Sequence, residues 1–329
     1  VAIGSGKNLS TTRNVLEGKY KIKEEILGSE PGQTQELRIL NKVVRLTSEG
    51  VELEADPRHV ELTIRDLELQ NAKPSTVPGA KEIKPRGSSL EQERAVDAIG
   101  KDCKGDEWSD KECGMGESTE EDEEEDLIKD DAKKYRAVAA RLNYIAPDRP
   151  DLAYAVKKAA RSMSAPKPSD MGRFRKIGRY LIGCPRLVQR FPWQSAELMI
   201  SAFTDSDWAG CSRTARSTSG GVLCVGEHVI KTYCRQQKVV ALSSAEAELY
   251  ATVAASAEAI ALGAYCGDLG MEMNAELYCD SSAALGIAHR AGIGKVRHLR
   301  TQGLWVQEVR ISGRVEYKKV LGAKNPADP

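Results

Sequence analysis

The last 135 residues, 195–329, alternate short β-branched runs with Ala-rich or amphipathic segments, and this alternation constrains the fold more than any other feature. The runs ELMISAFTDSD, STSGGVLCVG and HVIKTYCRQQ predict three consecutive strands joined by short turns. A long Ala-rich helix is expected from Ser243 to Leu269, ending near Gly270. The run AELYCDSS predicts a buried strand, and helices at about 282–290 and 298–309 precede a last strand at 314–321. Three antiparallel strands, a helix and further strands separated by helices predict a mixed α/β sheet.

The rest of the chain divides by composition, and a length of 329 residues predicts more than one domain. Residues 1–72 predict strands on either side of a turn at 48–50, then a helix with Pro57 in its first turn. Residues 73–131 are rich in Pro, Gly, Ser and charge, and the block ESTEEDEEED at 117–126 predicts an acidic, disordered linker. An acidic tail that binds basic partners is the alternative for this segment. Residues 132–194 predict a helical region, and the start at Val1 and the end at Pro329 suggest a piece of a longer protein.

Charge is balanced over the whole chain but not along it. Lys and Arg number 48 and so do Asp and Glu, yet the window 133–190 holds fifteen basic residues and three acids. Apolar residues recur there at helical spacing, so we expect a basic helical bundle whose outer faces neutralise phosphates. A solvated basic surface without a partner is the alternative reading.

Cysteine spacing and hydropathy exclude several classes of protein. None of the eight Cys forms a C-x-x-C pair, which argues against thiolate metal sites and favours reduced thiols in an intracellular protein. The sequence has no run of 18 apolar residues and no charged-then-apolar leader, so neither a membrane span nor secretion is expected.

Four carboxylates stand at strand ends or near a helix start, where side chains of a mixed α/β sheet converge. Asp205 ends the first strand of 195–329, Glu248 lies in the first turns of the long helix, Asp280 ends the fourth strand, and Asp328 follows the last strand. Carboxylates that converge on one crevice repel each other unless a hard cation is shared between them, and Mg²⁺ prefers such oxygen ligands. Two such ions can activate water and stabilise a leaving oxygen in phosphodiester cleavage.

The start of the long helix distinguishes two candidate glutamates. In LSSAEAEL, Ser243 is the expected N-cap and Glu246 the third helical residue of a capping box. Residues two apart point to roughly opposite faces of a helix, so Glu248 becomes the catalytic candidate if Glu246 closes the cap. Ser243 and Ser244 either hold a substrate phosphate at the helix N-terminus or serve in capping alone.

The short sequence motifs around these acids resemble those of a known family. FTDSDWAG, RSTSGGVL, QKVVALSSAEAELYA, LYCDSSAALGIA and NPADP occur in the order and spacing of the ribonuclease H domain of copia-type retrotransposon Pol polyproteins. The stretch from YRAVAARLNYIAPDRP to GRYLIG resembles the thumb-to-connection region of those polyproteins, and KYKIKEEILG with the hairpin at 37–55 resembles the last palm strands of their reverse transcriptase. The resemblance implies a ribonuclease H-like mixed five-stranded sheet with flanking helices over 195–329, a basic helical thumb/connection over 132–194 and a palm remnant over 1–72.

The family's activity is cleavage of the RNA strand of an RNA–DNA hybrid. The resemblance implies that Asp205, Glu248, Asp280 and Asp328 are both catalytic residues and ligands of two Mg²⁺ ions, with Mn²⁺ as the alternative metal. Asp205 would bridge both ions. Asp207 is expected to be a neighbour of the ligands, and it stays a further candidate ligand. The implied partners are the hybrid and the remainder of the Pol polyprotein.

The sequence departs from the family pattern at three places. Paired aspartates occur only at Asp130-Asp131, inside a polar stretch, so the polymerase centre is not expected in this chain. The family often has a second His six residues after His298, where this chain has Leu304, so a role for His in product release is doubtful. The chain ends one residue after Asp328, without the helix that would fix this carboxylate.

Two further hypotheses compete with an active ribonuclease H. The first is a catalytically inactive, nucleic-acid-binding remnant of a retrotransposon, which the departures favour. The second is an integrase or transposase, in which the acids run Asp, Asp, Glu with the Glu on a late helix. The order here is Asp, Glu, Asp, Asp, with Glu248 on the first long helix, which argues against the second hypothesis.

Overall fold

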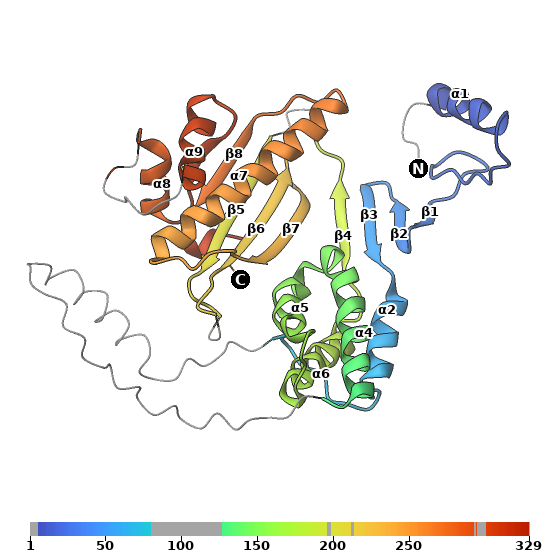
Figure 1. Cartoon of the computed structure of the whole chain (residues 1–329). Helices are drawn as coiled ribbons and strands as arrows, with labels where there is room; N and C mark the ends of the chain where they lie inside the picture. Colours follow the sequence, from blue (N-terminus) through green and yellow to red (C-terminus); the bar gives the residue numbers. More distant parts are fainter. Residues whose placement is uncertain are drawn as a thin grey trace, which may run out of the picture. The chain divides into compact units, whose positions relative to one another are not determined.

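We analysed a computed structural model that describes residues 6–79, 127–195, 199–211, 214–292, 294 and 301–328. Most of the expected acidic linker (80–126) and His298 lie outside the described residues. The chain separates into two compact units (Figure 1), one built from Val1–Arg58, Pro147–Pro150 and Arg186–Pro329, the other from His59–Ala146 and Asp151–Pro185. A helix, α1 (Gly6–Glu17), which the sequence did not predict, precedes the first strand and buries none of its residues.

The first unit contains a mixed five-stranded sheet in the order β7-β6-β5-β8-β9. Its strands are β5 (Ile200–Asp207), β6 (Thr218–Val225), β7 (His228–Gln236), β8 (Ala275–Cys279) and β9 (Glu316–Lys319). β5, β6 and β7 pair antiparallel, whereas β8 is parallel to both β5 and β9. The flanking helices are α7 (Ser244–Asp268), α8 (Ser282–His289) and α9 (Thr301–Ile311). The predicted fold class for 195–329 is therefore confirmed, and each strand or helix lies where its hydrophobic pattern placed it.

α7 is the central helix of this domain and packs across β5, β6 and β8 (Figure 1). Its buried residues include Leu249, Ala255 and Ala259, which join the core formed by the strands. The helix ends as expected: Gly270 has φ +78°, and the Met271 N–H donates to the Cys266 carbonyl at 2.9 Å. By length and composition α7 would also suit a membrane span, and its burial against the sheet gives its apolar content a role in the core.

A second, four-stranded antiparallel sheet lies in the same unit. Its strands, in order, are β1 (Glu36–Ile39), β2 (Lys42–Leu46), β3 (Gly50–Ala55) and β4 (Val188–Pro192). The single strand expected before the turn at 48–50 is thus two strands, because Leu40 and Asn41 both adopt positive φ and form a tight hairpin turn. The prediction of a helical region up to 194 is also wrong at its end, since 188–192 pairs with β3.

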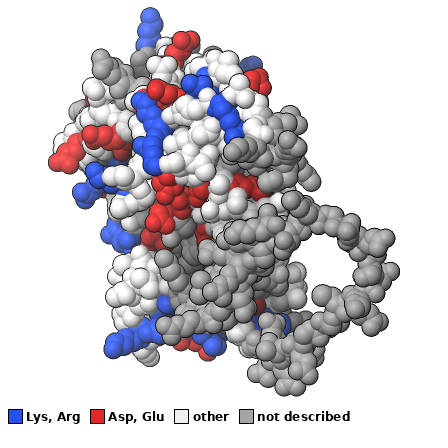
Figure 2. Space-filling model, turned by 90° about the vertical axis from the view of Figure 1, so that its left-hand side faces the viewer, with Lys and Arg blue, Asp and Glu red and all other residues white. Residues whose placement is uncertain are grey.

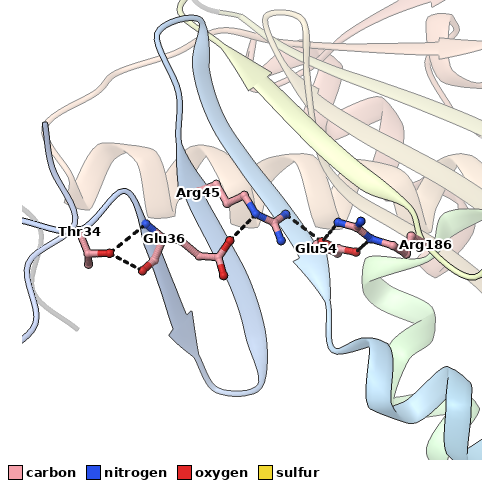
Figure 3. Close-up of polar contacts among 5 residues, drawn as sticks. All are labelled: Thr34, Glu36, Arg45, Glu54 and Arg186. Carbon is pink, nitrogen blue, oxygen red and sulfur yellow. Dashed lines mark hydrogen bonds and ion pairs between the residues drawn. The ribbon is translucent and has the colours of Figure 1, made fainter.

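A line of alternating charges crosses this sheet (Figure 3). Glu54 is only 3% exposed and accepts from Arg45 at 2.8 Å and from Arg186 at 2.5 Å. Arg45 also donates to Glu36 at 2.6 Å, while the Thr34 hydroxyl donates to the Glu36 carbonyl at 2.8 Å. The Arg186 guanidinium, with a smaller contribution from Arg45, holds the pKa of Glu54 below its usual value despite burial. The pairing of Glu54 with Arg186 therefore joins β3 to the segment that leads into β4.

The second unit is helical and has its own core. Its helices are α2 (Pro57–Asp66, which starts at the edge of the first unit), α4 (Lys129–Ile145), α5 (Ala153–Ala159) and α6 (Pro168–Gly183). Tyr135 and Phe174 are fully buried with ring centroids 4.7 Å apart. α4 starts at Lys129, so Asp130 and Asp131 lie in its first turn and not in a linker as expected. Carboxylates favour that position because they complement the helix dipole.

The positive charge counted along 133–190 is partly neutralised by acids that lie outside that window. Lys134 pairs with Glu68 at 2.7 Å and Arg141 pairs with Asp66 at 2.8 Å. Arg186 pairs with Glu54 in the first unit. The sequence window therefore overstates the free positive charge that this region offers to a phosphate backbone.

Candidate active site

Two of the predicted acids lie where the pairing of the parallel strands β5 and β8 ends. The pairing of these strands stops at Thr204 opposite Cys279, and Asp205 and Asp280 are the next residue of each. β5 continues for three residues past this point, still paired with β6. Parallel strands carry their carboxyl ends to one edge, so this part of the prediction follows from the register.

Asp205 is half-buried and surrounded by other carboxylates. Burial and, after it, the negative charges of Asp280, Asp328 and Asp207 raise the pKa of Asp205 to about 6, against the opposing effect of the hydrogen bond from the Ser206 N–H. The Ala327 carbonyl lies beside Gly220, which pairs with Asp205, and a Cβ atom at Gly322 would lie 3.2 Å from the Asp280 carboxylate, so the segment that carries Asp328 runs beside both acids. The structure therefore brings together three of the four predicted acids around the end of β5.

Glu248 joins this group from the first turns of α7. It is 9% exposed, and its Oε1 accepts from the Ser206 N–H at 3.1 Å and from the Ser206 hydroxyl at 2.7 Å. The pKa of Glu248 is raised to about 7 by burial and by the charges of Asp205 and Asp280, against the opposing effect of the hydrogen bonds from Ser206. All four predicted acids thus converge on one edge of the sheet.

Glu246 takes the capping role that the sequence suggested. Ser243 is the N-cap, and its hydroxyl accepts from the Glu246 N–H at 3.2 Å. The Glu246 carboxylate accepts from the Leu242 N–H at 2.8 Å and from the Tyr250 hydroxyl at 3.0 Å. A capping box would use the N–H of Ser243, so the backbone donor here is the residue before the N-cap. These bonds hold the Glu246 carboxylate at the start of α7. Ser243 and Ser244 are both exposed at the helix N-terminus, and their contact with phosphate stays a prediction.

A buried asparagine holds the segment that carries Asp328. Asn325 donates from Nδ2 to the Thr204 carbonyl at 3.0 Å and accepts the Ala327 N–H at 3.1 Å. The segment passes close over Gly220, where a Cβ atom would lie 2.6 Å from the Ala327 carbonyl oxygen. Asp328 itself is exposed. Asn325 therefore provides, within the chain, an anchor for Asp328 that the sequence analysis missed, although the motif NPADP contains it.

Asp207 lies at the end of β5 and faces the following turn. A Cβ atom at Gly210 would come within 1.8 Å of the Asp207 carboxylate, so that carboxylate rests against the turn at Gly210. The turn includes Ala209 in the left-handed region, with φ +52°. This orientation is consistent with Asp207 being a neighbour of the four predicted ligands and not a ligand itself.

The donor set suits a hard divalent cation. Oxygen atoms of Glu248 and Asp280 lie within 4.8 Å of each other and of the Cys279 sulfur. Cys279 is buried, and burial raises the pKa of its thiol to about 12, so it stays protonated and is a poor ligand. Figure 2, viewed from the side on which α8 and α9 lie in Figure 1, shows acidic side chains gathered in a patch. Carboxylate oxygens are the ligands that Mg²⁺ prefers.

The crowding of these acids predicts an unusual dependence of stability on pH for the metal-free protein. The folded state holds extra protons on Asp205 and Glu248 between pH 4.5 and 7, because both pKa values are raised. Their contribution to the free energy of unfolding is therefore complete below the unfolded pKa values and is lost as pH rises towards 7, by about 1.4 kcal/mol per unit of pKa shift. Urea unfolding in EDTA at several pH values measures this. Glu248→Gln should flatten the dependence, and an equal slope in that variant would contradict the assignment.

These features define an α/β domain that has a mixed five-stranded sheet, flanking helices and an acidic centre at the end of its central strand. No family model matches the chain. It is 32% identical over 156 residues to the retrovirus-related Pol polyprotein from transposon RE2 of Arabidopsis thaliana, a match that covers 47% of this chain and 11% of that protein. The relatives of this chain therefore include retrovirus-related Pol polyproteins from transposons, as the sequence motifs predicted.

Two more relatives differ in how much of each protein the match covers. The Pol polyprotein from transposon TNT 1-94 of Nicotiana tabacum is 27% identical over 194 residues, covering 58% of this chain and 14% of that protein. Secreted RxLR effector protein 161 of Plasmopara viticola is 32% identical over 124 residues, covering 38% of this chain and 87% of that protein. The chain thus spans only 11–14% of the length of the polyproteins it matches.

Solved structures that are similar to this chain include ribonucleases H and a reverse transcriptase. The N-terminal RNase H domain of Rv2228c from Mycobacterium tuberculosis has 19% identity and a TM-score of 0.29, covering 39% of this chain and 86% of that one. The foamy viral protease-reverse transcriptase in complex with double-stranded DNA has 11% identity and a TM-score of 0.43, covering 88% of this chain and 38% of that one.

Proposed function

We propose that residues 195–329 hydrolyse the RNA strand of RNA–DNA hybrids in a metal-dependent reaction, as part of a retroelement Pol polyprotein. The observation that supports this most strongly is the convergence of four carboxylates at the end of β5. Two of them, Asp205 and Glu248, have pKa values raised to about 6 and 7. Burial of these carboxylates, together with the charges of their neighbours, costs folding free energy, and a bound cation relieves that cost, so the arrangement favours a metal centre over a structural role.

In this proposal Asp205, Glu248, Asp280 and Asp328 hold two Mg²⁺ ions, with Mn²⁺ as the alternative. Bound ions of this kind lower the pKa of a coordinated water and stabilise the leaving oxygen of a phosphodiester. The chain's own residues hold the ligands still: Ser206 fixes Glu248, and Asn325 fixes the segment of Asp328. Rigid ligands keep the geometry that in-line displacement requires.

Substrate recognition in this proposal rests on shape and charge. A hybrid offers 2′-hydroxyl groups on one strand and phosphates on both. Ser243 and Ser244 are exposed at the N-terminus of α7, where N–H groups and the helix dipole favour a phosphate. The exposed basic residues of the helical unit would contact the backbone without reading bases.

The alternative is a catalytically inactive remnant that still binds nucleic acid. Partial neutralisation of the basic region and the exposure of Asp328 are the observations that keep it open. An inactive remnant would bind a hybrid without cutting it, so a cleavage assay separates the two functions.

We expect the protein to cut the RNA strand of an end-labelled RNA–DNA hybrid in the presence of Mg²⁺, and to stop doing so in EDTA. Double-stranded DNA and double-stranded RNA of the same sequence serve as matched controls and should stay intact, because the proposed reaction needs a ribose on one strand and a deoxyribose on the other. Gel electrophoresis of the labelled strands measures the products. Tight binding of the hybrid without cleavage in Mg²⁺ or Mn²⁺ would support the remnant instead.

A further inference from the structure

Ser206 occupies a place in the acidic centre that the sequence analysis did not consider. It stands between Asp205 and Asp207 on the part of β5 that extends beyond β8. The Ile200 N–H donates to the Asn274 carbonyl, so the N–H groups of even-numbered residues in β5 point to the β8 side. The Ser206 N–H points the same way, and because β8 has ended there it meets Glu248 instead.

The two bonds from Ser206 fall on one oxygen of Glu248. The backbone N–H donates to Oε1 at 3.1 Å and the hydroxyl donates to the same oxygen at 2.7 Å. Both lone pairs of Oε1 are therefore engaged. The other oxygen, Oε2, accepts a long hydrogen bond from the thiol of Cys279, a weak donor whose sulfur lies 3.9 Å away. The carboxylate is thus held in one orientation, with its two oxygens in different surroundings.

We propose that Ser206 is a positioning residue that engages Oε1 of Glu248 and leaves Oε2 as the oxygen available to a divalent cation. This inference rests on the proposed metal-dependent function, and it adds which residue fixes the ligand and which oxygen binds. Without the hydroxyl, Oε1 keeps only the longer bond from the backbone. The carboxylate then regains rotation about its last torsion, and ordering it again opposes binding of the cation.

The test is a calorimetric titration of the full chain with Mg²⁺ in the absence of nucleic acid, alongside hybrid cleavage at increasing Mg²⁺. Ser206→Ala should weaken Mg²⁺ affinity roughly 10- to 100-fold, as loss of groups that orient metal ligands commonly does. Its kcat at saturating Mg²⁺ should change much less than its affinity. Ser206→Thr retains the hydroxyl and should bind within a few-fold of the wild type.

The control is Ser201→Ala, at the opposite end of the same strand and remote from the acids, which should leave both affinity and cleavage unchanged. An unchanged Mg²⁺ affinity in Ser206→Ala overturns the inference, and so does a folded Ser206→Thr that binds as weakly as a folded Ser206→Ala.

Asp205→Asn separates this failure from that of the proposed function. If that variant loses Mg²⁺ affinity and Ser206→Ala does not, only the role of Ser206 is wrong. A wild type that neither binds Mg²⁺ nor cleaves overturns both.

Discussion

Replacing Asp205 with asparagine is expected to reduce hybrid cleavage by roughly 100- to 1000-fold, since metal ligands support several kcal/mol of transition-state stabilisation and about 1.4 kcal/mol is tenfold in rate. The two side chains have the same shape, so the packing at the end of β5 is preserved. The charge of Asp205 is the part that is lost, and with it the repulsion from Asp280 and Asp328. The metal-free variant should therefore be at least as stable as the wild type near pH 7.

This combination of lost activity and retained stability distinguishes a metal ligand from a structural residue. Single-turnover cleavage in Mg²⁺ measures the first, and urea unfolding in EDTA measures the second. Asp207→Asn is the matched control, because Asp207 lies two residues away on the same strand with its carboxylate against Gly210. Equal loss of cleavage in both variants would mean that Asp207 is a ligand, and wild-type cleavage by Asp205→Asn would exclude the proposed centre.

Replacing Asn325 with alanine is expected to reduce cleavage roughly 10- to 100-fold through Asp328, as for other groups that orient metal ligands. The variant loses the bond to the Thr204 carbonyl and the acceptor for the Ala327 N–H. A buried carbonyl left without a donor costs about 1–3 kcal/mol, so the free energy of unfolding should also fall. Higher Mg²⁺ should restore part of the rate, because Asp328 is displaced and not removed.

Two variants sharpen this prediction. Asn325→Asp keeps the acceptor for Ala327 but lacks the donor to Thr204, and we expect it to be impaired like the alanine variant. Lys324→Ala, at the exposed neighbouring position, is the matched control and should behave as the wild type. Cleavage at increasing Mg²⁺ and urea unfolding are measured on all three. If Asn325→Ala is destabilised but cleaves normally, Asn325 anchors the segment without positioning Asp328.

Much of the α/β domain and of its acidic centre could be predicted because periodic hydrophobic patterns determine which residues reach the core. Strong apolar runs gave β5, β6 and β8, and the Ser-x-x-Glu pattern at 243–246 located the start of α7 and so selected Glu248. The hairpin at Leu40-Asn41 was missed because Leu rarely adopts positive φ and the turn lacks Gly. Its conformation follows from the pairing of β1 with β2, which local sequence does not reveal.

Ser206 and Asn325 were missed for a different reason. Both are small polar residues without catalytic chemistry of their own, and their importance depends on which backbone groups the sheet leaves unpaired. The sequence contains no signal of where β8 stops relative to β5. The same holds for the charge of the basic region, because the acids that neutralise it, such as Glu68 and Asp66, lie outside the window that was counted.

β5 extends three residues past the end of β8. The function of the site therefore depends on the length of β5 relative to that of β8. The Thr204 carbonyl and the Ser206 N–H are free to bind Asn325 and Glu248 only because β8 ends at Cys279. A deletion of one residue within β5 would place its acids on the opposite face of the sheet and would break both contacts together. Side chains along β5 can therefore change during evolution more freely than the spacing between them, and insertions or deletions in this strand would be selected against even where single substitutions are tolerated.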